Sequence, residues 1–219
     1  MQIKQATEKS RILFSFISTI IFLLPSVTHA ADQDKKFQLL DASISGIQHR
    51  LESGEMTSVQ LVSKYLARIA AYDQKGPALN TITVINQNAK ERALQLDQER
   101  AKQGARGPLH GIPILVKDNY ETADMQTGLG ALIFEGWLPP HDGVIVKRLR
   151  DAGAIILGKT NMHEFAMGYA THGALFGQTR NPYALDYIPG GSSGGTGAAI
   201  AANFATAGFG SDTCGSIRM

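Results

Sequence analysis

Cysteine is almost absent from this chain of 219 residues. Cys214 is the single cysteine, so the chain cannot form an internal disulfide or a zinc site made of cysteine ligands. A domain built from this sequence therefore depends on its apolar core for stability. No internal repeat and no low-complexity tract divides the chain, which is long enough for one domain of ordinary size.

The sequence also lacks an excess of charge of either sign. Its formal net charge is +2, and removal of residues 1–30 would leave 18 basic and 18 acidic residues. Proteins that bind nucleic acids usually gather Lys and Arg on one face. The even balance argues against a nucleic-acid partner and against binding to an anionic lipid surface.

The apolar run near the N-terminus is too short to cross a bilayer comfortably, which takes about 20 residues. This run, Ile12–Leu24, follows three basic residues and ends before a proline, and small residues surround Ala30. Together these features predict a secretory signal peptide over residues 1–30. We therefore expect an exported protein, periplasmic or extracellular, with no stable membrane association after the leader is removed. An uncleaved membrane anchor is the alternative.

Residues 31–110 mostly show helical spacing of apolar residues. The segment Thr57-Ser58-Val59-Gln60 resembles a capping box that opens an amphipathic helix. We expect helices over Leu39–Leu51, from this capping box to Ala70 and over Asn88–Gln103, with a short strand over Thr81–Ile85.

Beyond Gly111, short apolar strands alternate with helices. We expect strands over Ile112–Val116, Ala154–Leu157 and, weakly, Ala205–Gly210, and helices over Val144–Ala152 and Ala198–Phe204. Such alternation predicts an α/β fold in which a central sheet is covered by helices on both faces.

Two serines stand in glycine-rich segments near the end of the chain. Ser192 lies within Gly190–Gly197, where several glycines permit backbone conformations that other residues rarely adopt. A phosphate-binding loop would need Gly-Lys-Ser/Thr at its end, and Gly195-Thr196-Gly197 has no lysine. A dinucleotide fingerprint needs a buried strand directly before the glycines, and Pro182–Pro189 is typical of a loop. A flexible linker is disfavoured by the apolar helix that follows.

The second serine, Ser216, follows Thr213-Cys214-Gly215. In such a turn, successive backbone N–H groups could converge on one point, as an oxyanion hole requires. Ser216 is therefore the candidate nucleophile. Asp212 and Arg218 flank the turn, and we expect them to brace it rather than to take part in the chemistry.

Lys117 follows the apolar strand Ile112–Val116, so its side chain starts from a buried strand end. To accept a proton near neutral pH it must be uncharged, which requires its pKa to fall from about 10.4 toward roughly 7 to 8. We expect the other lysines to be solvated. Alternation along the strand predicts that Asp118 points to the opposite face, away from Lys117.

These groups, in their flanking sequence, resemble the amidase signature family. The resemblance runs from about Leu40 to the end and is strongest over residues 107–119, 158–165 and 190–218. The spacing is also similar, because 75 positions separate Lys117 from Ser192 and 24 separate Ser192 from Ser216. The resemblance implies a mixed central sheet with helices on both faces.

The resemblance further implies a separate catalytic role for each of three residues. Ser216 would attack an amide carbonyl, Ser192, held by a cis peptide bond, would relay the proton, and Lys117 would be the terminal base. Ser193 would support this network. The reaction would need neither a cofactor nor a metal. Cys214 stands where the family usually has glycine, which leaves the backbone donor in place and narrows the pocket. The implied oxyanion hole consists of backbone N–H groups of Thr213, Cys214, Gly215 and Ser216.

Histidines offer the rival chemistry of a Ser-His base or a metal site. None has HExxH spacing, since Phe165-Ala166-Met167 follows His163-Glu164. We therefore expect no metal requirement, and a Ser-His base remains the alternative mechanism. The histidines considered are His110, His141, His163 and His172.

The resemblance leaves three possibilities for what this chain does. The first is an exported amidase that acts on a small amide or a C-terminal peptide amide. The second is the A subunit of an amidotransferase, which passes ammonia to a partner acting on aminoacyl-tRNA, and the predicted leader counts against it. The third is an inactive truncated fragment.

Family members are usually more than twice this long, so we expect residues 31–219 to be the N-terminal portion of one amidase domain. Such a piece would expose apolar surface and an unpaired sheet edge. We therefore expect it to be poorly stable and weakly active or inactive alone, and we assign the chemistry to the intact domain.

Overall fold

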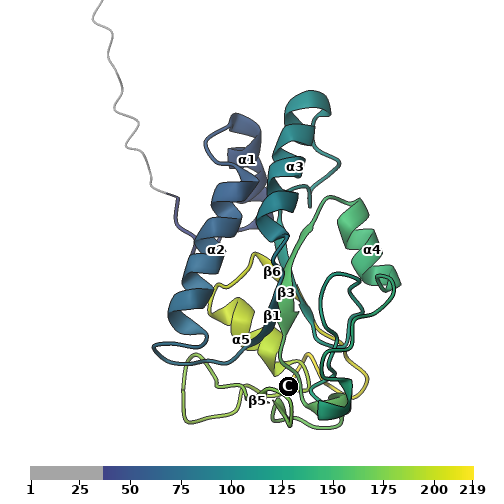
Figure 1. The fold of residues 1–219 in the computed structure, drawn as a ribbon. Helices are drawn as coiled ribbons and strands as arrows, with labels where there is room; N and C mark the ends of the chain where they lie inside the picture. Colours follow the sequence, from purple (N-terminus) through teal and green to yellow (C-terminus); the bar gives the residue numbers. More distant parts are fainter. Residues whose placement is uncertain (1–36) are drawn as a thin grey trace, which may run out of the picture. The chain divides into compact units, whose positions relative to one another are not determined.

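Residues 37–219 are the part of the chain that the computed structural model describes (Figure 1). The predicted leader over residues 1–30 lies outside these described residues. Within residues 37–219, no helix combines the length and the apolar character that a membrane crossing requires.

Capping side chains determine where the first helices begin. The prediction began the first helix at Leu39, but the helix begins at Ile44, because the side chain of Ser43 caps it by accepting the N–H of Gly46. The predicted capping box is confirmed, since Thr57 and Gln60 bond reciprocally at the start of the second helix. The helices are α1 (Ile44–Ser53), α2 (Ser58–Tyr72), α3 (Ala89–Gln103), α4 (Val144–Asp151), α5 (Gly194–Ala201) and the 3-10 helices η1 (Leu132–Phe134) and η2 (Glu164–Ala166).

Four strands form a mixed sheet in the order β1-β3-β2-β6. β1 lies antiparallel to β3, whereas β2 lies parallel to both β3 and β6. The central strands β2 and β3 are buried along their whole length, and β4 and β5 form a separate antiparallel pair. The strands are β1 (Ile82–Ile85), β2 (Pro113–Lys117), β3 (Ile155–Thr160), β4 (His172–Gly173), β5 (Gly177–Gln178) and β6 (Ala207–Phe209).

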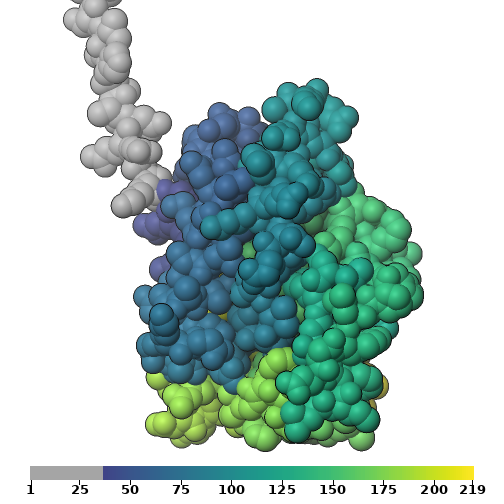
Figure 2. All heavy atoms as spheres, in the orientation of Figure 1, coloured from purple at the N-terminus to yellow at the C-terminus, as the bar shows by residue number. Residues whose placement is uncertain are grey.

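Helices cover this sheet on both faces. In Figure 1, α2 and α5 lie to one side of β3 and α4 lies to the other, and both α4 and α5 contact β3. α3 packs against α2 and β3. In Figure 2, α1 to α3 and the segment around α4 form the face in view and hide the sheet. The predicted α/β fold with a mixed sheet is confirmed.

Strand β3 is longer than the sequence pattern indicated. The prediction ended at Leu157, whereas β3 continues to Thr160 because its last residues pair with the end of β2. Thr160 lies opposite Lys117 in this register. The extension brings Lys159 and Thr160 to the same end of the two central strands as Lys117.

The prediction for α5 was wrong at both ends. We expected Ala198–Phe204, but the helix begins at Gly194. The first turn of α5 contains glycines because it packs too closely on its neighbours for side chains at Gly194 and Gly195: a Cβ on Gly195 would collide with the backbone carbonyl of Asn161. The helix ends at Ala201, before Asn203, whose φ of 58° is left-handed.

This close approach predicts opposite effects for two substitutions on one helix. Gly195→Ala should destabilise the protein by about 1–3 kcal/mol, because the new methyl group overlaps backbone atoms. Gly197→Ala should stabilise it by roughly 0.5–1 kcal/mol, because nothing lies within 4 Å of the added Cβ. Urea unfolding of the intact protein measures both free energies. Equal effects of the two substitutions would contradict the packing described here.

Candidate active site

Lys117 lies at the centre of the predicted site. It is the last residue of β2, and its side chain is fully buried. Its Nζ donates to Ser192 Oγ at 2.6 Å and to Ser211 Oγ at 2.8 Å. The structure therefore places this amine in direct contact with one of the two predicted serines.

Burial also changes how Lys117 binds protons. Removal from solvent lowers the pKa of Lys117 to about 8, against the opposing effect of the Asp212 carboxylate. This value lies at the upper end of the range that the sequence analysis required. A substantial fraction of the amine is uncharged near pH 8 and can accept a proton.

Ser192 is fully buried in the glycine-rich segment, directly before α5. The peptide bond between Gly191 and Ser192 is cis. Thr171 holds the segment from outside, since its hydroxyl donates to Gly190 O at 2.7 Å and accepts the N–H of Gly194 at 2.9 Å. These contacts fix the backbone on both sides of the Ser192 hydroxyl.

Ser216 lies next to this segment through a backbone contact. The N–H of Ser193 donates to Ser216 O at 2.9 Å, and the side chain of Ser216 is largely buried. Within residues 37–219, no hydrogen bond joins the hydroxyl groups of Ser192 and Ser216. Catalytic hydrogen bonds are often looser without substrate, and a proton transfer between the two serines requires their hydroxyl groups to come within hydrogen-bond distance.

Asp212 and Arg218 brace the turn that carries Ser216. Arg218 Nε donates to Asp212 Oδ2 at 2.7 Å, and the N–H of Gly215 donates to Asp212 Oδ1 at 2.7 Å. The hydrogen bond from Arg218 holds the pKa of Asp212 at about 2. Asp212 is therefore ionised at every physiological pH and anchors both ends of the turn.

This brace affects the predicted oxyanion hole. Because the N–H of Gly215 points to Asp212, it is not free for a ligand in this structure. The N–H groups of Thr213, Cys214 and Ser216 have no such partner within the described residues. The Cys214 side chain is exposed. The oxyanion role of these four N–H groups stays a prediction.

Ser211 belongs to the site, and the sequence analysis did not identify it. Its hydroxyl accepts from Lys117 and, at 3.2 Å, from Asn119 Nδ2. Its carbonyl accepts the Ser193 hydroxyl at 3.0 Å, which gives Ser193 a place in the same network. Ser211 follows β6, and only the parallel pairing of β6 with β2 brings the ends of these two strands together.

Asp118 and Lys159 lie on the other face of the sheet. Asp118 points away from Lys117, as alternation predicted, and its Oδ1 lies 3.7 Å from Lys159 Nζ. The expectation that lysines other than Lys117 are solvated is wrong for Lys159, which is fully buried. The reason is that β3 extends to Thr160, so Lys159 belongs to a central strand that is buried along its whole length.

Within the described residues, no histidine side chain is hydrogen-bonded to Lys117, Ser192 or Ser211, although the backbone N–H of His163 donates to Ser192 O at 3.1 Å. His110 is fully buried, with Nε2 at 2.9 Å from Leu96 O and Nδ1 accepting the N–H of Arg106. His172, on β4, is exposed. Among residues 37–219, no group of three or more His, Cys, Asp and Glu side chains is arranged to hold a metal ion. The expected independence from metals stays a prediction.

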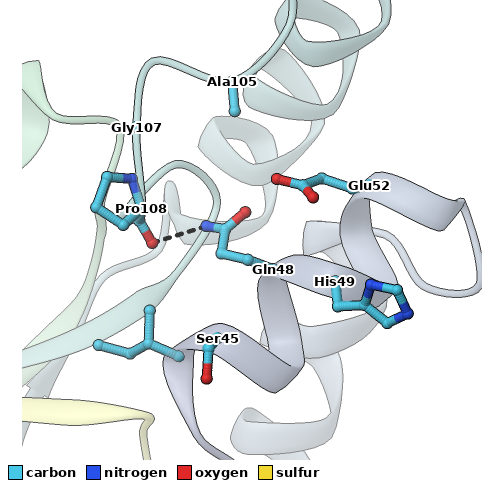
Figure 3. A pocket seen from close by; sticks show the side chains of 8 residues that line it. Ser45, Gln48, His49, Glu52, Ala105, Gly107 and Pro108 are labelled. Atoms are coloured by element: carbon cyan, nitrogen blue, oxygen red, sulfur yellow. Dashed lines mark hydrogen bonds between the residues drawn. The ribbon is translucent and has the colours of Figure 1, made fainter.

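A cavity of about 860 Å³ lies between α1 and the loop over residues 105–108 (Figure 3). The amide of Gln48 donates to Pro108 O at 2.9 Å across it. The cavity contains none of the predicted site residues, so it is separate from the network around Lys117. Its lining residues are Ile44, Ser45, Gln48, His49, Glu52, Ala105, Gly107 and Pro108.

A family model described as Amidase matches residues 60–219 of this chain. Two curated relatives are glutamyl-tRNA(Gln) amidotransferase subunits A. The subunit from Streptomyces coelicolor is 43% identical over 181 residues, which are 83% of this chain and 36% of the relative. The subunit from Thermobifida fusca is 45% identical over 182 residues, with the same shares. The chain thus spans about a third of the length of these relatives.

Solved structures share the fold at moderate identity. The peptide amidase from Stenotrophomonas maltophilia matches with a TM-score of 0.79 and 44% identity, over 81% of this chain and 37% of that chain. A fatty acid amide hydrolase matches with a TM-score of 0.76 and 28% identity, over 82% of this chain and 32% of that chain. The comparisons thus extend over most of the described residues.

Proposed function

We propose that the intact protein hydrolyses a carbon–nitrogen bond of a linear amide. The premise is that this chain belongs to the amidase family. The observation that carries the proposal is the 2.6 Å hydrogen bond from the buried Lys117 amine to Ser192 Oγ. Burial lowers the pKa of this amine to about 8, and the amine is in contact with the hydroxyl of one of the two predicted serines. Both conditions are needed for a lysine that acts as a general base.

In the proposed reaction, Ser216 Oγ attacks the amide carbonyl and forms a tetrahedral intermediate. The Ser216 proton passes to Ser192 Oγ while the Ser192 proton passes to Lys117 Nζ. Backbone N–H groups of the turn over residues 213–216 would stabilise the negative oxygen. The intermediate then collapses, and the leaving nitrogen takes a proton back from Lys117 through Ser192. Water cleaves the acyl ester by the same route and restores Ser216.

A small amide or a C-terminal peptide amide is the proposed substrate class. The similarity to a peptide amidase at 44% identity supports it. We further propose that the protein is exported, which the sequence of residues 1–30 supports. A role as an amidotransferase A-type subunit is the second candidate, favoured by the identity to such subunits at 43% and 45%.

Ammonia release distinguishes these candidates. We expect the intact protein to release ammonia from C-terminal peptide amides without any added subunit, and to act on glutamine at least ten times more slowly. Ser216→Ala should release none and serves as the control. Release that occurs only from glutamine, and only with partner subunits and aminoacyl-tRNA, would favour the amidotransferase role. No release from any amide, with or without partner subunits, would contradict both candidates.

A further inference from the structure

Behind the site, the sheet contains a second buried lysine that the proposed reaction does not use. Lys159 on β3 and Asp118 after β2 are both fully buried, with Nζ and Oδ1 3.7 Å apart. The side chain of Lys117 projects from the other face, toward Ser192. The two lysines therefore lie at one edge of the sheet but on opposite faces.

Asp118 has few groups that can balance its charge. Its Oδ2 accepts the N–H of Gly128 at 2.9 Å. Its Oδ1 has no hydrogen-bond donor within the described residues, so the Lys159 amine is the cation that faces it. Lys159 also donates to Thr127 Oγ1 at 2.8 Å and to Gln126 O at 3.2 Å, which holds it in place.

Asp118 follows Lys117 directly in the chain, and its side chain projects to the opposite face of the sheet, toward Lys159. An unbalanced carboxylate close to a lysine favours the protonated amine, which cannot accept a proton. We propose that the buried Asp118 carboxylate, one residue from Lys117, also acts on the Lys117 amine through the sheet. Lys159 is then a positioning residue that balances the charge of Asp118 from the far face and so keeps the Lys117 amine available as a base. This inference rests on the proposed function, because it concerns the same base.

Other carboxylates also act on the two lysines: Asp212 raises the pKa of Lys117, and Asp124 and Glu121 raise that of Lys159. Asp212 pairs with Arg218 and Asp124 pairs with Arg150. Helix α5 and strand β1 present no ionisable side chain to the site. Burial lowers the pKa of Lys159 to about 8 and raises the pKa of Asp118, as expected for a pair enclosed by protein. The titratable groups that face this region are Tyr120, Glu121, Asp124, Arg150, Asp212 and Arg218.

A titration of Lys117 in four proteins tests the inference. The intact protein, Lys159→Met, Asp118→Asn and the double variant are prepared with isotope-labelled lysine, and the Lys117 side-chain signal is followed by NMR against pH. Lys117→Met identifies that signal. The titration reads the charge of Lys117 directly and does not depend on turnover.

Lys159→Met should raise the Lys117 midpoint by about one pH unit, because Asp118 loses its counter-charge. Asp118→Asn should lower the midpoint, and the double variant should return it to the value of the parent protein. A Lys117 midpoint that is unchanged or lower in Lys159→Met would overturn the inference. If removal of one partner prevents folding of Lys159→Met, Asp118→Asn decides, and an unchanged or raised midpoint overturns the inference.

The same proteins separate this inference from the proposed function. Labelling of Ser216 by a phosphonate reagent reports whether the serine is activated. If the midpoints move as expected but labelling does not depend on Lys117, the proposed function fails and the charge balance stands. If labelling depends on Lys117 and the midpoints do not move, only the inference about Lys159 fails.

Discussion

Replacing Lys117 with alanine is expected to slow acylation of Ser216 by about a thousandfold, within the range that a general base contributes. The reason is that Lys117 Nζ is the group that contacts Ser192 Oγ and can take its proton. Phosphonylation of Ser216 by a phosphonate reagent is measured in place of acylation, because both reactions require an activated serine. The reagent also requires no knowledge of the natural amide. The intact protein and its variants are compared by the rate of labelling.

Two kinds of control accompany this measurement. Lys147→Ala removes an exposed lysine that pairs with Asp151 on α4, and it should leave the rate unchanged. His110→Ala and His172→Ala test the rival Ser-His base and should also retain labelling, provided that the His110 variant folds. Labelling that survives in Lys117→Ala and disappears in a folded histidine variant would replace the lysine by a histidine as the base.

The pH dependence of labelling follows from the same group. Since only the uncharged amine accepts a proton, the rate should rise with pH and level off above the pKa of Lys117, which burial lowers to about 8. An unperturbed lysine would give a rise centred near 10.4. A midpoint at that higher value would mean that the amine is solvated in the working enzyme.

The sequence predicted well those elements whose signals are local. The capping box of Thr57 and Gln60 and the apolar run of β2 depend on neighbours in the chain, and both appear where expected. The start of α5 was missed because glycine disfavours helices in general. Here the close contact between Gly195 and Asn161 outweighs that propensity, and such a contact is visible only in three dimensions.

The site could be predicted only in part for a related reason. Lys117, Ser192 and Ser216 were found through their flanking residues, and the structure brings Lys117 and Ser192 into contact. Ser211 and Lys159 were missed because their positions depend on strand pairing. Ser211 follows β6, and the end of β3 carries Lys159, so neither could be placed before the register with β2 was known.

The mixed sheet explains why one short strand end can serve two purposes. Successive side chains alternate between faces, so Lys117 and Asp118 project to opposite faces although they are neighbours in sequence. The serines contact the lysine on one face, while the carboxylate meets Lys159 on the other. A helix could not separate two adjacent side chains in this way, since neighbouring residues there lie only about 100° apart.

Replacing Ser192 with alanine is expected to reduce the labelling rate of Ser216 by about a hundredfold to a thousandfold. Lys117 contacts Ser192 and Ser211 but makes no hydrogen bond to Ser216 within the described residues. Without the Ser192 hydroxyl, the proton of Ser216 has no direct path to the amine. Ser53→Ala, on the exposed surface of α1, is the matched serine control and should leave the rate unchanged.

The Ser192 variant also distinguishes a relay from a structural role. Ser211 still accepts a hydrogen bond from Lys117 in this variant, so the amine should remain buried with a titration midpoint near that of the parent protein. A slow rate with an unchanged Lys117 midpoint would therefore locate the defect in proton transfer. A slow rate with a midpoint raised toward 10.4 would instead mean that Ser192 only keeps the amine enclosed. An undiminished rate would remove Ser192 from the reaction altogether, since Ser216 would then reach its base by another route.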